Sequence, residues 1–130
     1  MPWDDSRHAL GVAAMDDTHR EFVALVEAAV AATDAEFPAL FAQLHAHTVR
    51  HFDDEARLMQ SCRFAARSEH EGEHQRILGQ LDFLAQRVRG GRLTMARAYV
   101  EGLPSWFAGH LATMDSALAG ALKATDAVPA

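Results

Sequence analysis

The sequence predicts an all-α protein, an up-down-up-down antiparallel four-helix bundle preceded by an N-terminal arm. Apolar side chains recur at helical spacing in four blocks, and no block shows the strict alternation of a half-buried strand. The connections between blocks are short, which favours antiparallel neighbours. A chain of 130 residues with 49% hydrophobic and 23% charged residues has an ordinary globular composition. We therefore expect a single domain across residues 1–130.

The arm and the first helix make up the N-terminal part of the chain. Residues 1–15 are expected to form an arm that lies across the bundle. The first helix should run from about 17 to 33, because apolar residues return there at helical spacing and Asp16 or Asp17 can cap it.

The second and third helices form the middle of the chain. Asp34 is a plausible cap for the second, which continues to about residue 59 and tolerates Pro38 only because that residue lies near its start. The third should run from about 66 to 89, where Gly90 and Gly91 stop it.

The fourth helix contains one awkward residue. Thr94 can cap this helix, which extends to Leu122. Pro104 removes a backbone donor inside it and clashes with the preceding turn, which predicts a kink near residues 100–104 or a helix that restarts at Pro104. Residues 123–130, rich in small side chains, should form a frayed tail.

Charge and cysteine content limit the classes of function. The net charge is -6, and the basic residues are scattered, which argues against a nucleic-acid-binding surface. No stretch approaches the roughly 18 apolar residues of a membrane span, and the acidic N-terminus does not resemble a signal peptide. Cys62 is the only cysteine, so no intramolecular disulfide is possible. We expect a cytoplasmic monomer, and the sequence does not identify a protein partner.

Seven polar residues on the four blocks form a candidate ligand set for two metal ions. His51 and Glu55 are four residues apart, as are His70 and His74, so each pair points within about 40° of one direction, one turn apart. Unpaired, each such group on an apolar stripe would cost about 1–3 kcal/mol. Hydrogen-bonded core histidines would explain one or two of these residues but not all seven. The complete set is His19, His51, Glu55, His70, His74, His110 and Asp115.

The spacing of His110 and Asp115 requires a distorted helix. In a regular α-helix, residues five apart point about 140° away from each other, so these two side chains would not face one site. A single π-type turn between them would bring both onto one line. We therefore predict a π-turn there, and a regular α-helical ladder from residue 108 to 117 would refute it.

The chain resembles the hemerythrin family, specifically its single-domain bacterial members. The resemblance covers nearly the whole chain and includes the five-residue step to Asp115. The residues that carry it are Trp3, Leu10-Gly11-Val12, Met15-Asp16-Asp17-Thr18-His19, His51-Phe52-Asp53-Asp54-Glu55 with Met59, the pair His70 and His74, and Trp106-Phe107-Ala108-Gly109-His110.

This resemblance implies a non-heme centre of two iron ions. One iron would be held by His70, His74 and His110, and the other by His19 and His51. Glu55 and Asp115 would bridge the two ions together with an oxo or hydroxo group. Five imidazoles and two carboxylates suit a borderline metal such as iron, although manganese or zinc could occupy the same ligands.

The implied function is reversible binding of dioxygen for transport, storage or sensing, without enzymatic activity. One alternative is a di-iron oxidase or an enzyme that handles peroxide or nitric oxide. Such enzymes use more carboxylates and Glu-x-x-His pairs, which this site lacks. A second alternative is an oxygen or redox signalling module.

Several neighbouring residues are candidates for supporting roles. An apolar wall around bound oxygen would limit access of water and protons. Asp16 is a candidate to orient the His19 ring by a hydrogen bond, and His47 is either a proton relay or a partly exposed polar residue. The wall candidates, for which plain core packing is the alternative, are Phe22, Phe52, Trp106, Phe107 and Leu111.

Overall fold

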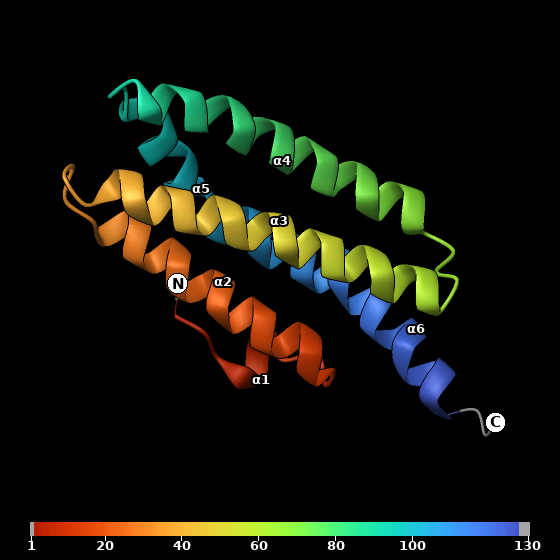
Figure 1. Cartoon of the computed structure of the whole chain (residues 1–130). Coiled ribbons are helices and arrows are strands. Elements are labelled where there is room, and N and C mark those ends of the chain that lie inside the picture. Colours follow the sequence, from red (N-terminus) through yellow and green to blue (C-terminus); the bar gives the residue numbers. More distant parts are fainter. Residues whose placement is uncertain (1, 128–130) are drawn as a thin grey trace.

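The four main helical segments of the bundle run antiparallel to one another, and the prediction of an all-α four-helix bundle is confirmed (Figure 1). A computed structural model describes residues 2–127. Within that range the chain forms helices and no strands. The elements are α1 (Asp5–His8), α2 (Ala13–Ala31), α3 (Phe37–Ser61), α4 (Arg67–Arg89), α5 (Thr94–His110), the π-helical turn η1 (Leu111–Asp115) and α6 (Ser116–Ala127). Because α5, η1 and α6 follow without a break, they act together as the fourth helix of the bundle.

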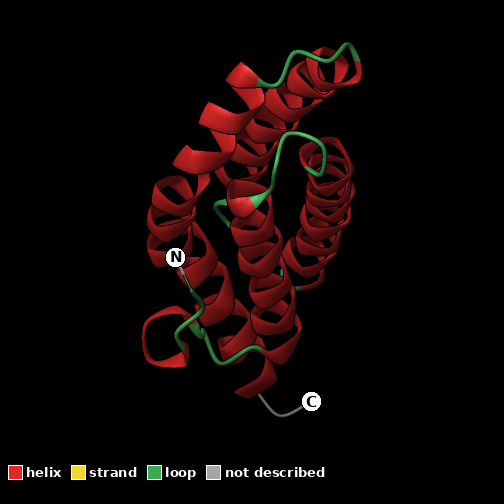
Figure 2. Ribbon diagram, turned by 90° about the vertical axis from the view of Figure 1, so that its left-hand side faces the viewer, coloured by secondary structure: helices red, strands yellow, loops and turns green. Residues whose placement is uncertain are grey.

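The N-terminal arm lies beside the start of α2 and contains the short helix α1, which the sequence did not predict (Figure 2). Arg20 on α2 holds Asp5 through an ion pair of 3.1 Å. The helix α2 begins at Ala13, earlier than expected, and has no side-chain cap at Val12. Asp16 therefore lies inside the first turns of α2 rather than capping it.

The turn between α2 and α3 is closed by a reciprocal pair of hydrogen bonds that the sequence analysis did not identify. The Glu36 carboxylate accepts hydrogen bonds from the backbone N–H of Thr33 at 2.9 Å and from its hydroxyl at 3.0 Å. The Thr33 hydroxyl accepts one from the backbone N–H of Glu36. The expected cap, Asp34, instead pairs with Arg97 of α5 at 3.4 Å. The helix α3 begins at Phe37, so the prediction of a start directly after Asp34 was wrong by two residues.

The fourth helix departs from its prediction at three points. Thr94 is the first residue of α5, and Leu93, whose side chain cannot cap a helix, stands at the N-cap position. The helix α5 continues through Pro104 and does not restart there, whereas the kink expected near it stays a prediction. Residues 123–127 belong to α6, so the described part of the predicted tail is helical, and residues 128–130 lie outside the described range.

Two apolar clusters stabilise the bundle and lie on either side of its polar interior. The larger one packs side chains from α2, α3, α4 and α5, among them Phe37, Phe41 and Leu81. The smaller one joins Met15 of α2 to Met59 of α3 and to α6. No helix within residues 2–127 is long and apolar enough to cross a membrane.

Candidate metal centre

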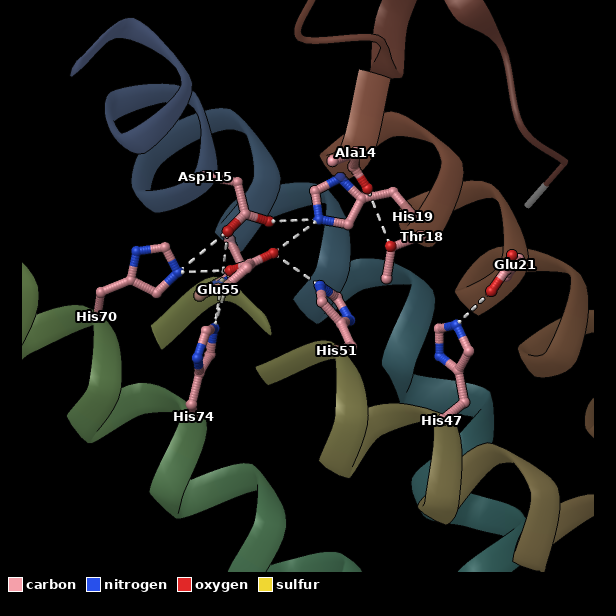
Figure 3. Close-up of polar contacts among 11 residues, drawn as sticks. Ala14, Thr18, His19, Glu21, His47, His51, Glu55, His70, His74 and Asp115 are labelled. Carbon is pink, nitrogen blue, oxygen red and sulfur yellow. Dashed lines mark hydrogen bonds and ion pairs between the residues drawn. The ribbon is translucent and has the colours of Figure 1, made fainter. Parts of the chain in front are cut away.

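All seven predicted ligand residues converge in the interior of the bundle. They come from α2, α3, α4, α5 and η1, and none is more than 6% exposed. Figure 3 shows their side chains from α2, α3, α4 and η1 pointing toward a common centre. Each of the five histidines directs its Nε2 atom there. The helical spacing that predicted this set therefore placed its members in contact.

The first ligand group contains three histidines and both carboxylates. The Nε2 atom of His70 lies 3.1 Å from Oε1 of Glu55 and 3.1 Å from Oδ1 of Asp115. The Nε2 atom of His110 lies 3.2 Å from the same Asp115 oxygen and 3.2 Å from Nε2 of His74. One donor atom from each of these five residues fits within 4.8 Å of all the others.

The second ligand group contains His19, His51 and Glu55. The Nε2 atoms of His19 and His51 lie 3.1 and 2.7 Å from Oε2 of Glu55. His19 also lies 3.3 Å from Oδ2 of Asp115. Each carboxylate thus directs one oxygen toward the three-histidine group and the other toward the two-histidine group, which is the arrangement needed to bridge two ions.

A π-helical turn brings Asp115 to the centre. The chain is α-helical up to His110, then π-helical over Leu111–Asp115, then α-helical again. Because a π-turn accommodates one extra residue, side chains five apart come to lie on the same face of the helix. The predicted distortion is confirmed, and it places the Asp115 carboxylate at a fully buried position.

Both carboxylates are ionised in the metal-free protein. Burial raises the pKa of Glu55, but the charge of His51 and hydrogen bonds from neighbouring imidazoles hold that pKa well below its usual range. Burial and the nearby Glu55 also raise the pKa of Asp115, and contacts from His110, His19 and His70 more than offset them. The centre therefore holds two negative charges that require compensation.

Three histidines of the centre, His19, His70 and His74, have shifted pKa values. Burial lowers the pKa of His19 and of His70, yet the contacts of both rings with Asp115 and Glu55 outweigh it and raise each pKa to about 9. Burial lowers the pKa of His74 to about 3. In the metal-free protein, protons on His19 and His70 therefore supply positive charge that bound cations would supply instead.

The unpaired atoms of the centre also fit a metal. Glu55 Oε1, His70 Nε2 and both Asp115 carboxylate oxygens are buried and make no hydrogen bond of good geometry, although they lie at ion-pair distance from one another. Buried polar atoms normally find hydrogen-bond partners, so a cluster without them needs an explanation. A pair of cations with imidazole and carboxylate ligands would satisfy these atoms.

Comparison with known proteins agrees with the geometry of the centre. The family model described as the hemerythrin HHE cation binding domain matches residues 10–122. The chain belongs to the hemerythrin family. Bacteriohemerythrin of Ralstonia nicotianae is 34% identical over 115 residues, which make up 88% of this chain and 83% of that relative.

Solved hemerythrin structures share the fold. Wild-type hemerythrin matches with a TM-score of 0.84 at 21% identity, covering 94% of this chain and 97% of the other. A hemerythrin variant with tyrosine in place of a leucine gives the same TM-score and identity, covering 94% and 96%. At this identity the likeness concerns the arrangement of the helices.

Aromatic side chains surround this hemerythrin centre in two ways. Phe52 stacks on His74 with ring centroids 3.8 Å apart and an interplanar angle of 2°, and Trp106 stacks on His110 at 4.7 Å and 20°. Phe107 approaches His19 edge-on, with centroids 5.3 Å apart. The stacked rings therefore cover ligands of the three-histidine group, and the edge-on contact belongs to the two-histidine group.

A small apolar cavity is lined by the two phenylalanines that contact the histidines of the two-histidine group, and by none of the seven ligand residues. Phe22 contacts His51 edge-on at 6.0 Å and Phe107 at 5.1 Å. Both phenylalanines line the cavity, with Val23, Val26 and Pro104 completing its wall. Among the other wall candidates, Leu111 is buried in the larger apolar cluster, and Phe52 and Trp106 do not line this cavity.

The two expected supporting residues make different contacts. The Asp16 carboxylate accepts hydrogen bonds from the backbone N–H groups of Leu10 and Gly11, at 2.7 and 3.1 Å. These bonds hold the arm against α2. The prediction that Asp16 orients His19 was wrong, because this carboxylate in the first turn of α2 points back along the chain to the backbone of the arm. His47 is buried, and its Nε2 atom lies 3.1 Å from the Glu21 carboxylate. It is not in either ligand group.

One set of contacting residues was missed by the sequence analysis. The indole N–H of Trp106 donates a hydrogen bond to Glu73, which Arg76 also binds. Two signals were available in the sequence. Glu73 directly precedes the ligand His74, and Arg76 follows Glu73 three positions later on the same helix. Nothing in the sequence pairs these residues with Trp106, which is 33 positions away.

Proposed function

We propose that this protein binds dioxygen reversibly at a di-iron centre, for transport, storage or sensing. The observation that carries this proposal is the division of each carboxylate between the two ligand groups. Glu55 and Asp115 both have one oxygen near His70, and both have the other near His19. A site with two shared carboxylates is suited to two neighbouring ions rather than one.

The two ions would have unequal ligand sets. His70, His74 and His110 would hold one iron, and His19 and His51 the other, with the carboxylates shared. One ion would then have one protein ligand fewer, which leaves a position for an exogenous molecule. Two ferrous ions in this centre would supply the two electrons needed for reversible capture of dioxygen.

The side chains around the two-histidine group would protect this chemistry from water. Phe22 and Phe107 lie against its rings and enclose an apolar cavity of about 10 Å³. That volume is at the lower limit for a single water-sized molecule, and its apolar wall offers water no hydrogen-bond partner. A small apolar gas is therefore favoured over water beside this iron. Phe52, Trp106 and Leu111 would close the remaining sides.

The donor set favours oxygen binding over oxidase chemistry. Enzymes with di-iron carboxylate centres gather four carboxylates and two histidines. Here five histidines accompany only two carboxylates, so the centre has less negative charge to stabilise highly oxidised iron.

The proposal is tested by optical spectroscopy of the protein loaded with ferrous iron in the absence of air. Exposure to oxygen should produce a visible charge-transfer band, and purging with inert gas should remove it over several cycles. Glu55→Gln, which lacks the shared charge, is the control and should show no such band. Direct conversion to a stable ferric spectrum, without a reversible band, would overturn reversible binding and favour an oxidase or a redox sensor.

A further inference from the structure

Besides the contact between the ligands His74 and His110, two side-chain hydrogen bonds join α4 to α5 within residues 2–127, and one of these two lies next to the metal centre. The Tyr99 hydroxyl donates to the Gln80 side-chain oxygen at 2.7 Å, away from the ligands. The Trp106 indole N–H donates to the Glu73 carboxylate. Glu73 directly precedes the ligand His74, and Trp106 lies one turn before the ligand His110. The second bond therefore joins the two helices at the level of the centre.

Trp106 also contacts a ligand directly. Its indole lies nearly parallel to the His110 imidazole, with ring centroids 4.7 Å apart. A ring that is hydrogen-bonded at its N–H cannot rotate freely, so the face it presents to His110 is held in place. The position of His110 is thus tied, through Trp106, to Glu73 on α4.

Glu73 is itself held on both oxygens. Arg76, one turn further along α4, donates hydrogen bonds to it at 2.8 and 3.2 Å. The Glu73 carboxylate therefore accepts hydrogen bonds from two side chains, Arg76 on its own helix and Trp106 on α5. A charged acceptor strengthens the bond from the indole N–H.

The region around His110 needs such support. His110 is the last residue of α5, and the backbone ladder changes from α-helical to π-helical directly after it. Its Nδ1 atom has no hydrogen-bond partner, so no hydrogen bond fixes the ring from behind. The Nε2 atoms of His110 and His74 lie 3.2 Å apart, so one ring can donate a hydrogen bond to the other in the metal-free protein, and both can bind one cation.

We propose that Trp106 and Glu73 are positioning residues that hold His110 and His74 at the spacing required by the ion of the three-histidine group. This inference rests on the metal centre of the proposed function and is independent of oxygen binding. The orienting partners of metal ligands typically contribute 10- to 100-fold in metal affinity. Loss of the hydrogen bond between Trp106 and Glu73 should therefore lower the affinity for one of the two bound ions and leave the affinity for the other nearly unchanged.

The test is titration of the metal-free protein with cobalt(II) in competition with a chelator, with the visible ligand-field spectrum as a second readout. Trp106→Phe keeps an aromatic ring on His110 but removes the N–H donor, and Glu73→Ala removes the acceptor without touching the interior. Both variants should bind one cobalt ion normally and the other about 10-fold or more weakly, with a changed spectrum for the weak ion.

Tyr99→Phe is the matched control, because it removes a hydrogen bond between the same two helices farther from the ligands. It should bind both ions as the wild type does, and melting curves of the metal-free proteins report any general loss of stability. The proposed positioning role would be overturned if Trp106→Phe and Glu73→Ala bound both ions with wild-type affinity. It would also be overturned if Tyr99→Phe weakened ion binding as much as these two variants do. A wild-type protein that binds fewer than two cobalt ions would overturn the metal centre itself.

Discussion

The two ligand groups of the centre share their carboxylates but differ in how their imidazoles are supported. In the three-histidine group, the faces of His74 and His110 are covered by the stacked rings of Phe52 and Trp106. In the two-histidine group, Phe107 and Phe22 meet the histidines only edge-on, and a small cavity remains between them. One group is packed to hold an ion, and the other retains space beside it.

Under the proposed function, this difference would let one bundle combine firm metal binding with exchange of a small ligand. Stacked rings leave an imidazole no room to tilt, because protein interiors are close-packed. Edge-on contacts fill space less completely, and the phenylalanines that make them line a small apolar cavity. The comparison predicts that substitutions on the two sides will have distinct effects.

The largest effect is expected from the residue that both groups share. Glu55→Ala should abolish binding of both ions, because it removes one oxygen from each group and leaves Asp115 alone to join them. Metal analysis after reconstitution measures the stoichiometry. Asp54→Ala is the control, since this neighbouring carboxylate is exposed and pairs with Arg57. Two ions retained in Glu55→Ala would contradict a shared bridge.

The next effect separates the two groups. His110→Ala should lose the ion of the three-histidine group, and His51→Ala the ion of the two-histidine group, so each variant should retain about one ion. Only His51→Ala should lose the site facing the apolar cavity. Metal analysis combined with binding of azide as a small probe distinguishes the two. Simultaneous loss of both ions in both variants would show that the groups are not separable.

A smaller effect concerns the cavity wall. Phe107 is 1% exposed, and Phe107→Ala should lower the free energy of unfolding by about 3–5 kcal/mol and enlarge the space beside His19. Azide should then reach the centre faster. Phe83→Ala is the control, because Phe83 is 52% exposed and its removal should change stability by about 0.5 kcal/mol or less. An unchanged azide rate in Phe107→Ala would argue against this entry point.

The smallest effect is the pH dependence of the metal-free protein. The pKa values of His19 and His70 rise from 6.5 to about 9 on folding, so their stabilisation is complete below pH 6.5 and is lost as the pH rises through 9. The pKa of His74 falls to about 3, so the unfolded chain binds the extra proton between pH 3 and 6.5, and stability increases with pH over that range.

The melting temperature of the metal-free protein should therefore be highest near pH 6.5 and decline by several degrees toward pH 9. Bound metal displaces the protons from His19 and His70, so the metal-loaded protein should lack the alkaline decline. Thermal melting followed by circular dichroism measures both forms. An alkaline decline of equal size with and without metal would assign it to other groups.

Local spacing explains how much of this structure could be predicted from the sequence. The ligand pair His51 and Glu55 and the pair His70 and His74 depend only on the helical repeat, which is a property of neighbouring residues. The π-turn was predictable because His110 and Asp115 had to face one site while lying five residues apart. In each case the number of residues between two ligands on one helix determines which way their side chains point.

Contacts between distant residues were not predictable in this way. The reciprocal bonds of Thr33 and Glu36 are different, because residues three apart in a T-x-x-E pattern are a local capping signal that was available in the sequence, and Asp34 was chosen as the cap instead. The carboxylate of Asp16 was drawn to free backbone N–H groups of the arm rather than to the side chain of His19. The pairing of Trp106 with Glu73 depends on how α4 and α5 are rotated against each other. The spacing of apolar residues along each helix does not determine that rotation.

The π-helical turn also determines how the fourth helix can change in length. A π-turn holds one residue more than the regular helix requires, and that surplus is confined to Leu111–Asp115. Deleting the exposed residue Thr113 would leave His110 and the carboxylate four positions apart, on one face of an ordinary α-helix. Leu118 and Ala119 would keep their buried positions, because the phase of α6 relative to α5 would not change. The ligand cluster should therefore tolerate a single-residue deletion here, whereas the same deletion in a regular helix of the bundle would rotate the residues beyond it out of the core.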